Sequence, residues 1–208
     1  MNSKPQASML TFARELPNIC SLLGLLSAVL GIYFAISGNF PVAIIGLLWA
    51  VLFDWLDGFI ARRMKDRTRE QEAFGAQLDS MIDIVSFGVL PAILLLSYGN
   101  YDFLYIPGAF IVITSGAIRL SYFNVYGLID NKAYLGLSVD SNGLILPFIF
   151  LFESFLSHTS FSIILYALLL VLSALNVSSI RMNKLSGRWI YIVVAYVLIM
   201  TTIFGWII

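Results

Sequence analysis

The sequence is poor in cysteine and in charged side chains. One cysteine, Cys20, occurs among 208 residues, so an intrachain disulfide is excluded and no redox compartment can be inferred. Charged residues make up 12% of the chain, about half of the roughly 25% found in soluble domains. The formal net charge is zero, so bulk electrostatics indicates no nucleic-acid partner. The N-terminal stretch lacks an apolar core followed by a small-residue cleavage site, and we expect no removable signal peptide.

Long apolar runs make up most of the remaining sequence. Hydrophobic residues account for 60% of the chain and the mean hydropathy is +0.91. A membrane-spanning helix needs about 20 mostly apolar residues. Seven segments approach this length, the fifth being short: Asn18–Ser37, Pro41–Ala61, Ala76–Tyr98, Phe103–Val125, Ser141–Leu156, Ser160–Ser179 and Trp189–Ile208. The sequence therefore predicts an all-α polytopic membrane helix bundle of about seven spans. Because no long linker interrupts it, we interpret residues 1–208 as a single domain.

Basic residues are distributed unevenly between the two sides of the predicted bundle. Cytoplasmic connections of membrane proteins carry an excess of lysine and arginine. If the N-terminus is cytoplasmic, all basic residues except Arg119 fall on the cytoplasmic side: Lys4, Arg14, Arg62, Arg63, Lys65, Arg67, Arg69, Lys132, Arg181, Lys184 and Arg188. We therefore expect a multi-pass membrane protein (in the inner membrane if bacterial) with a cytoplasmic N-terminus and a C-terminus on the opposite side.

Four aspartates lie at the predicted cytoplasmic ends of the second and third spans. Asp54 and Asp57 are three residues apart and Asp79 and Asp83 are four apart, so each pair occupies one helix face. A short connection makes the two helices antiparallel neighbours, which lets the pairs converge. Ionisable groups in a spanning helix cost about 2.5–3.5 kcal/mol each on insertion scales, so a cation should compensate them. Carboxylate oxygens are hard ligands, and the set predicts a Mg²⁺ or Mn²⁺ site.

Small residues and one arginine accompany these acids. Gly58 follows Asp57, Ala61 lies about one turn later, and Gly75 lies one turn before Asp79. Their size would let a bulky phosphorylated ligand approach the backbone, and Arg62 could meet its phosphates. The alternative interpretation is that they only allow close helix packing, which is common in membranes.

The eight residues together form the pattern Asp-x2-Asp-Gly-x2-Ala-Arg, a spacer, then Gly-x3-Asp-x3-Asp. This pattern resembles the CDP-alcohol phosphotransferase family, with all eight defining positions present. The spacer between Arg62 and Gly75 has twelve residues, which is longer than the eight or nine usual in the family. The resemblance implies a six-helix catalytic core, to which the C-terminal span is added, and a homodimer.

The resemblance also implies a role for each motif residue. Asp54, Asp57 and Asp79 would hold one metal, and Asp79 and Asp83 would share a second. Asp83 would be the base that takes the proton from the attacking hydroxyl. The residues expected around the CDP moiety are Gly58, Ala61, Arg62 and Gly75.

Segments after the motif resemble one branch of the family, the phosphatidylserine synthases. They are SFGVLPA from Ser86, GAIRLSYFNV from Gly116, LNVSSIRMNKL from Leu175, and YLGLSVDSNGLILP from Tyr134, in which Ser138 replaces a proline of the branch. The branch implies CDP-diacylglycerol and L-serine as substrates. The carboxylate of serine requires an arginine and its ammonium requires acceptors.

Four residues are therefore candidates for substrate contacts outside the motif. Arg119, the one arginine inside a predicted span, and Asn124 could bind the acceptor. The alternatives are an ion pair between Arg119 and a site acid, and a helix-end cap for Asn124. Arg181 and Lys184 could bind a lipid phosphate or anchor the helix at anionic headgroups.

Two other functions stay open at this stage. A divalent-cation transporter would also carry intramembrane acids, although the outer halves of the spans offer no matching chain of acids. A family member could use another acceptor, namely glycerol phosphate, inositol phosphate or choline. A phosphorylated acceptor would require cationic groups beyond Arg119.

Overall fold

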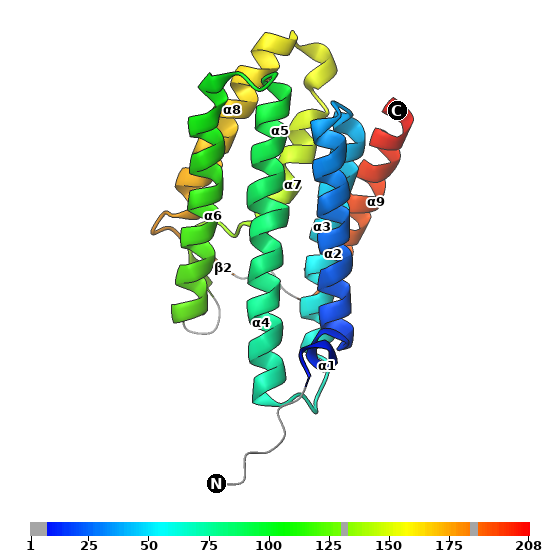
Figure 1. Ribbon diagram of the computed structural model, residues 1–208, viewed down its shortest axis with the longest axis vertical. Coiled ribbons are helices and arrows are strands. Elements are labelled where there is room, and N and C mark those ends of the chain that lie inside the picture. The colour runs from blue at the N-terminus through cyan, green and yellow to red at the C-terminus, as the bar shows by residue number, and fades with distance from the viewer. Residues whose placement is uncertain (1–7, 130–132, 184–186) are drawn as a thin grey trace.

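The computed structural model describes residues 8–129, 133–183 and 187–208, and these form a bundle of long helices (Figure 1). Helix α1 (Met9–Ala13) is short and precedes the bundle. The other helices are α2 (Leu16–Ile36), α3 (Phe40–Ala61), α4 (Arg69–Asp83), α5 (Leu90–Tyr98), α6 (Ile106–Tyr126), α7 (Asp140–Phe150), α8 (His158–Asn176) and α9 (Trp189–Ile207). Strands β1 (Ala133–Leu135) and β2 (Arg181–Asn183) form a small antiparallel sheet beside the bundle. The predicted all-α membrane bundle is confirmed.

Six helices are long and apolar enough to cross a membrane among the described residues. They cover Leu16–Ile36, Phe40–Ala61, Arg69–Tyr98, Phe103–Tyr126, His158–Asn176 and Trp189–Ile207. Each overlaps one of the predicted spans. The N-terminal helix α1 and the C-terminus lie at opposite ends of the bundle, and the basic connection between α3 and α4 lies at the α1 end (Figure 1).

The predicted fifth span, Ser141–Leu156, is wrong as a full span. Its residues form α7, whose 11 residues extend only about 16 Å, against a hydrocarbon core about 30 Å thick. Helix α7 begins inside the bundle and runs toward the end opposite α1 (Figure 1), where the 3₁₀ turn η3 (Glu153–Phe155) follows. Apolar composition alone could not distinguish this buried half-helix from a span.

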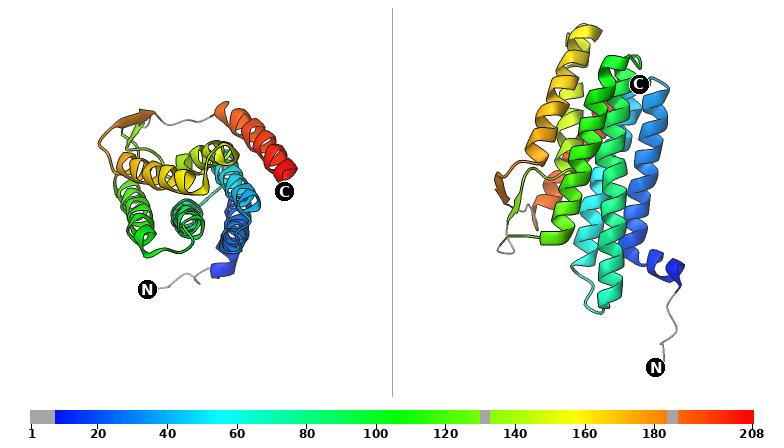
Figure 2. Two further views of the ribbon diagram at one scale, coloured as in Figure 1. Left: turned by 90° about the horizontal axis from the view of Figure 1, so that it is seen from above. Right: turned by 60° about the vertical axis from the view of Figure 1, so that its left-hand side comes forward.

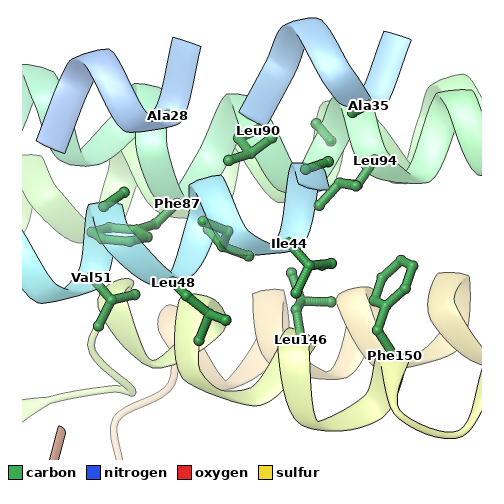
Figure 3. Close-up of a cluster of buried hydrophobic side chains, with 14 of the residues drawn as sticks. Ala28, Ala35, Ile44, Leu48, Val51, Phe87, Leu90, Leu94, Leu146 and Phe150 are labelled. Atoms are coloured by element: carbon green, nitrogen blue, oxygen red, sulfur yellow. The ribbon is translucent and has the colours of Figure 1, made fainter. Parts of the chain in front are cut away.

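One face of helix α7 packs in the apolar core of the bundle. Leu146 and Phe150 of α7 are buried against Ile44 and Leu48 of α3 (Figure 3). Phe87, from the segment between α4 and α5, and Leu90, the first residue of α5, belong to the same cluster and are almost completely buried. This packing fixes where the N-terminal end of α7 lies relative to α3.

The third span is one continuous helix of 30 residues, Arg69–Tyr98, with a change of geometry inside it. It begins at Arg69 and not near Ala76, because the side chains of Thr68 and Gln71 form a capping box that starts α4. A π-helical turn, η1 (Ile84–Val89), directly follows Asp83. Such turns often occur at functional sites, and this one separates the acidic half of the span from its apolar half.

Helices α2 and α3 pack with their backbones in close approach. A Cβ atom added to Gly46 would lie 2.8 Å from the Gly31 Cα and 2.8 Å from the Ser27 carbonyl oxygen. Small residues at helix interfaces permit this geometry in membranes. The contact aligns the first turns of α2 with the acidic end of α3. Helix α9 packs along another face of α3 (Figure 2).

Candidate active site

Three of the four motif aspartates converge as the sequence predicts. Asp54 and Asp57 on α3 and Asp79 on α4 each place one carboxylate oxygen within 4.8 Å of the others. Asp83 is not part of this set, but it lines the same cavity of about 190 Å³ as the other three. The i, i+3 and i, i+4 spacings put each pair on the facing sides of two antiparallel helices. The arrangement provides a cluster of hard oxygen ligands at one end of the bundle.

A hydroxyl group from α2 supports this cluster. Ser21 is buried and donates a hydrogen bond to Asp57 Oδ2. A hydrogen bond to the charged form of a carboxylate stabilises that form. Ser21 is not predictable as a site residue, because a serine in an apolar helix carries no sequence pattern of its own. Its contact depends on the tight α2–α3 packing.

A second cavity, of about 170 Å³, adjoins the first, and Asp57 and Asp79 line both cavities. Gly58, Ala61 and Gly75, three of the four predicted CDP-binding residues, line this second cavity. Asn18 and Ser21 of α2 complete its wall. The fourth residue, Arg62, lines the first cavity, which Gly58 also lines. The small residues therefore border a space next to the acids. This geometry agrees with the hypothesis that they face a ligand.

The space around Gly75 is too small for a larger side chain. A Cβ atom at this position would lie 2.7 Å from Arg67 Nη2 and 3.0 Å from Asn18 Oδ1. Both atoms belong to side chains that line the second cavity. The glycine thus leaves room for two polar side chains, and a larger residue would displace them.

Arg67 belongs to the long spacer and is held in place from α2. Its Nη2 lies 2.9 Å from Glu15 Oε2 and also donates to the Gln71 carbonyl oxygen at 3.0 Å. Both side chains of the ion pair are only 8% exposed. Sequence analysis used Arg67 only for orientation, because nothing in the spacer indicated that it turns back toward α2.

Arg119 of α6 reaches the first cavity and is 6% exposed. Its Nε donates to the Leu137 carbonyl oxygen at 3.3 Å. The guanidinium carbon lies 5.5 Å from the Phe123 ring centroid and 5.1 Å from that of Tyr134. Within the described parts of the chain, no carboxylate lies within 4.0 Å of Arg119, so the alternative of an ion pair with a site acid is not observed. Its charge is available to a ligand.

A fifth aspartate, Asp140, lines the first cavity and was missed by sequence analysis. Asp140 is the first residue of α7, and its Oδ2 accepts a hydrogen bond of 3.0 Å from Trp55 Nε1. Its Oδ1 is buried without a hydrogen-bond partner. The sequence motif ends at Asp83, and only the folding of α7 against α3 brings Asp140 beside it.

Tyr134 of β1 also lines the first cavity. Burial raises the pKa of its phenol above the usual value, and the negative charge of Asp140 raises it further. The phenol therefore stays protonated at neutral pH and can donate a hydrogen bond.

The remaining predicted residues lie elsewhere. Asn124 is exposed and does not line the first cavity; its Oδ1 accepts a hydrogen bond of 3.0 Å from Ser80 Oγ on α4. Arg181 is exposed on β2, where it pairs with Leu135 of β1. Lys184 lies outside the described residues. The geometry therefore adds no support for acceptor binding by Asn124, and the lipid contact of Arg181 stays a prediction.

Comparison with known proteins identifies relatives that cover most of the chain. The family model of CDP-alcohol phosphatidyltransferase matches residues 14–208. Archaetidylserine synthase of Methanothermobacter thermautotrophicus is 37% identical over 190 residues, which are 90% of this chain and 76% of that protein. CDP-diacylglycerol–serine O-phosphatidyltransferase of Methanocaldococcus jannaschii is 32% identical over 76% of this chain and 73% of its own length. The protein of that name in Helicobacter pylori is 27% identical over 79% of this chain and 70% of its own length.

Proposed function

Because the chain belongs to the CDP-alcohol phosphatidyltransferase family, we propose that this enzyme transfers the phosphatidyl group of CDP-diacylglycerol to the hydroxyl of L-serine. The products are phosphatidylserine and CMP. The observation that carries the proposal is the cluster of Asp54, Asp57 and Asp79, which borders two cavities of different character. Family membership also decides against a cation transporter, because the family consists of transferases.

The second cavity is assigned to the nucleotide. Gly58, Ala61 and Gly75 line it without side chains that would occupy it, so a cytidine moiety can approach the backbone of both helices. Its diphosphate would extend toward Asp57 and Asp79, which the two cavities share. Arg62, at the first cavity, can meet phosphate oxygens there.

The acidic cluster fits a divalent cation by its chemistry. Three carboxylates with oxygens within 4.8 Å of one another are hard ligands of the kind that Mg²⁺ and Mn²⁺ prefer. Asp54, Asp57 and Asp79 would hold one ion, and Asp79 and Asp83 would share a second. The bound ions would neutralise the diphosphate and stabilise the charge that develops on the departing CMP phosphate.

Asp83 is assigned as the base. It lines the first cavity and lies outside the three-carboxylate set, so one of its oxygens would remain for the acceptor if the other held the second ion. Asp83 takes the proton of the serine hydroxyl while the hydroxyl oxygen bonds to the phosphorus that carries the lipid. The bond from that phosphorus to the CMP oxygen breaks, and CMP leaves with the electron pair.

Arg119 is assigned to the carboxylate of serine. It is buried at the first cavity without a carboxylate partner among the described residues, and a guanidinium binds a carboxylate with paired hydrogen bonds. The three relatives share serine in their printed names, while the first differs in its lipid. We propose CDP-diacylglycerol as the lipid substrate, and the assay below also supplies its ether counterpart because of the first relative. We also propose that the site faces the cytoplasm and that the chain forms a homodimer.

Assay of the purified protein tests this proposal. CDP-diacylglycerol and the ether-linked CDP-lipid are each supplied with Mg²⁺ or Mn²⁺ and with one acceptor: serine, glycerol phosphate, inositol phosphate or choline. CMP release should depend on both the metal and serine, and chelation of the metal should abolish it. Turnover of another acceptor with none of serine would overturn the serine assignment. Undiminished turnover after chelation would overturn the metal assignment.

A further inference from the structure

We propose that Asp140, held in place by Trp55, binds the ammonium group of the amino-acid acceptor while Arg119 binds its carboxylate. The inference rests on the proposed function and assigns the element of the site that distinguishes an amino acid from a simple hydroxy acid.

The two side chains come from different parts of the chain and meet at one cavity. Arg119 lies on α6 and Asp140 begins α7, and both line the first cavity together with Asp83. A free amino acid presents a cation and an anion on the same carbon atom. A pocket that binds it therefore needs one group of each sign within a few ångströms of the reacting hydroxyl, and Arg119 and Asp140 supply these groups.

Asp140 differs from the motif acids in its contacts. It does not belong to the set of Asp54, Asp57 and Asp79 whose oxygens lie within 4.8 Å of one another. Its Oδ2 is occupied by the Trp55 indole, while its Oδ1 has no hydrogen-bond partner. A buried carboxylate oxygen without a partner is unfavourable, and a ligand N–H group at the cavity would satisfy it.

Two features of the fold orient the Asp140 carboxylate at the first cavity. It occupies the first turn of α7, a helix of 11 residues, whose N-terminal end carries partial positive charge. The Trp55 N–H bond of 3.0 Å adds a second favourable contact and fixes the carboxylate orientation. Asp140 is thus an oriented carboxylate that lies outside the set of Asp54, Asp57 and Asp79.

Two different roles for Asp140 would produce the same contact with Trp55. In the first, the Trp55–Asp140 bond only ties α7 to α3 and keeps the neighbouring Asp54 in place. In the second, Asp140 is an additional metal ligand. Acceptor analogues separate these roles from ammonium binding, since only ammonium binding depends on which group the acceptor carries.

The experiment compares serine with 3-hydroxypropionate, which lacks the ammonium, and with ethanolamine, which lacks the carboxylate. Each analogue is measured as a substrate and as a competitive inhibitor against serine. Asp140→Asn keeps the size of the side chain and an oxygen for the Trp55 indole but removes the charge. It should raise the KM for serine by roughly 10- to 100-fold. The KM for the CDP-lipid and the affinity for 3-hydroxypropionate should not change.

Asp66→Asn is the matched control, because Asp66 is an exposed aspartate at the same end of the bundle and lines neither cavity. It should leave all constants at wild-type values. Equal losses for serine and 3-hydroxypropionate in Asp140→Asn would overturn the assignment in favour of a structural tie. Recovery of serine turnover at high metal concentration would overturn it in favour of a metal ligand. If the wild-type enzyme turns over a different acceptor and does not turn over serine, the proposed function itself is overturned, and the assignment of Asp140 with it.

Discussion

Arg67 and Glu15 form an ion pair of 2.9 Å that joins the spacer of the motif to the start of α2. Both side chains are only 8% exposed, so water screens the pair little. Because Arg67 lines the second cavity, the ion pair fixes part of the wall of that cavity. The spacer thus supplies one side chain, that of Arg67, to the wall of the second cavity.

Removing one partner of this pair should be more harmful than removing both. Glu15→Ala leaves the Arg67 guanidinium buried without a counter-charge, which typically costs about 3–5 kcal/mol. The double variant Glu15→Ala/Arg67→Met removes both charges and should recover much of that stability. Thermal unfolding of the purified variants in detergent measures the difference, with Asp66→Ala as an exposed control. A double variant that unfolds at a lower temperature than Glu15→Ala would contradict this expectation and show that Arg67 stabilises the fold even without its counter-charge.

Enlarging Gly75 should weaken binding of the CDP-lipid. In Gly75→Ala the added Cβ lies 2.7 Å from Arg67 Nη2, so the arginine must move within the cavity wall. We expect the KM for the CDP-lipid to rise on the order of tenfold, ~1.4 kcal/mol, with the KM for serine unchanged. Gly205→Ala is the matched control, because a Cβ there meets nothing within 4 Å. Unchanged nucleotide affinity in Gly75→Ala would contradict the assignment of the second cavity.

The acidic cluster could be predicted from sequence because its geometry is almost entirely local. Two aspartates at helical spacing share a face whatever surrounds them, and a short connection makes two helices neighbours. Asp140 and Ser21 reach the same site only through tertiary packing, of α7 against α3 and of α2 against α3. The residues around Asp140 and Ser21 in the sequence contain no pattern that predicts these contacts.

The fifth span shows the limit of hydropathy. Leu146 and Phe150 of α7 pack in the protein core, while Phe148, Phe152 and Phe155 of the same segment are exposed. An apolar segment such as residues 141–156 fits a short, partly buried helix as well as a membrane span. The start of α4 was missed for a different reason. The Thr68–Gln71 capping box extends the helix into a polar stretch that hydropathy excludes.

The orientation of the bundle can be tested by labelling single cysteines. Cys20 is buried, and Cys20→Ala provides the background. Ser154→Cys lies in the exposed turn η3 at the end opposite α1, and Lys65→Cys lies in the exposed basic connection. A membrane-impermeant thiol reagent should label Ser154→Cys in intact cells, and Lys65→Cys only after the cells are opened. The reverse pattern would place the active site outside.

Substitutions of different aspartates in the site should affect catalysis and binding differently. Asp83→Asn keeps the size of the side chain but cannot accept the proton of the serine hydroxyl. Because Asp83 lies outside the three-carboxylate set, this variant should retain most of its CDP-lipid affinity. Its kcat should fall by roughly 10²-fold or more.

Asp57→Asn should instead weaken binding, because Asp57 belongs to the carboxylate set and borders both cavities. The loss of one carboxylate lowers metal affinity, and the KM for the CDP-lipid should rise with it. A high metal concentration should restore part of the activity of Asp57→Asn and none of the activity of Asp83→Asn. CDP-lipid affinity and kcat are measured for both variants across a metal titration. If both variants lose CDP-lipid binding to the same extent and metal restores both alike, then Asp83 acts chiefly as a ligand and the assigned base must be another group.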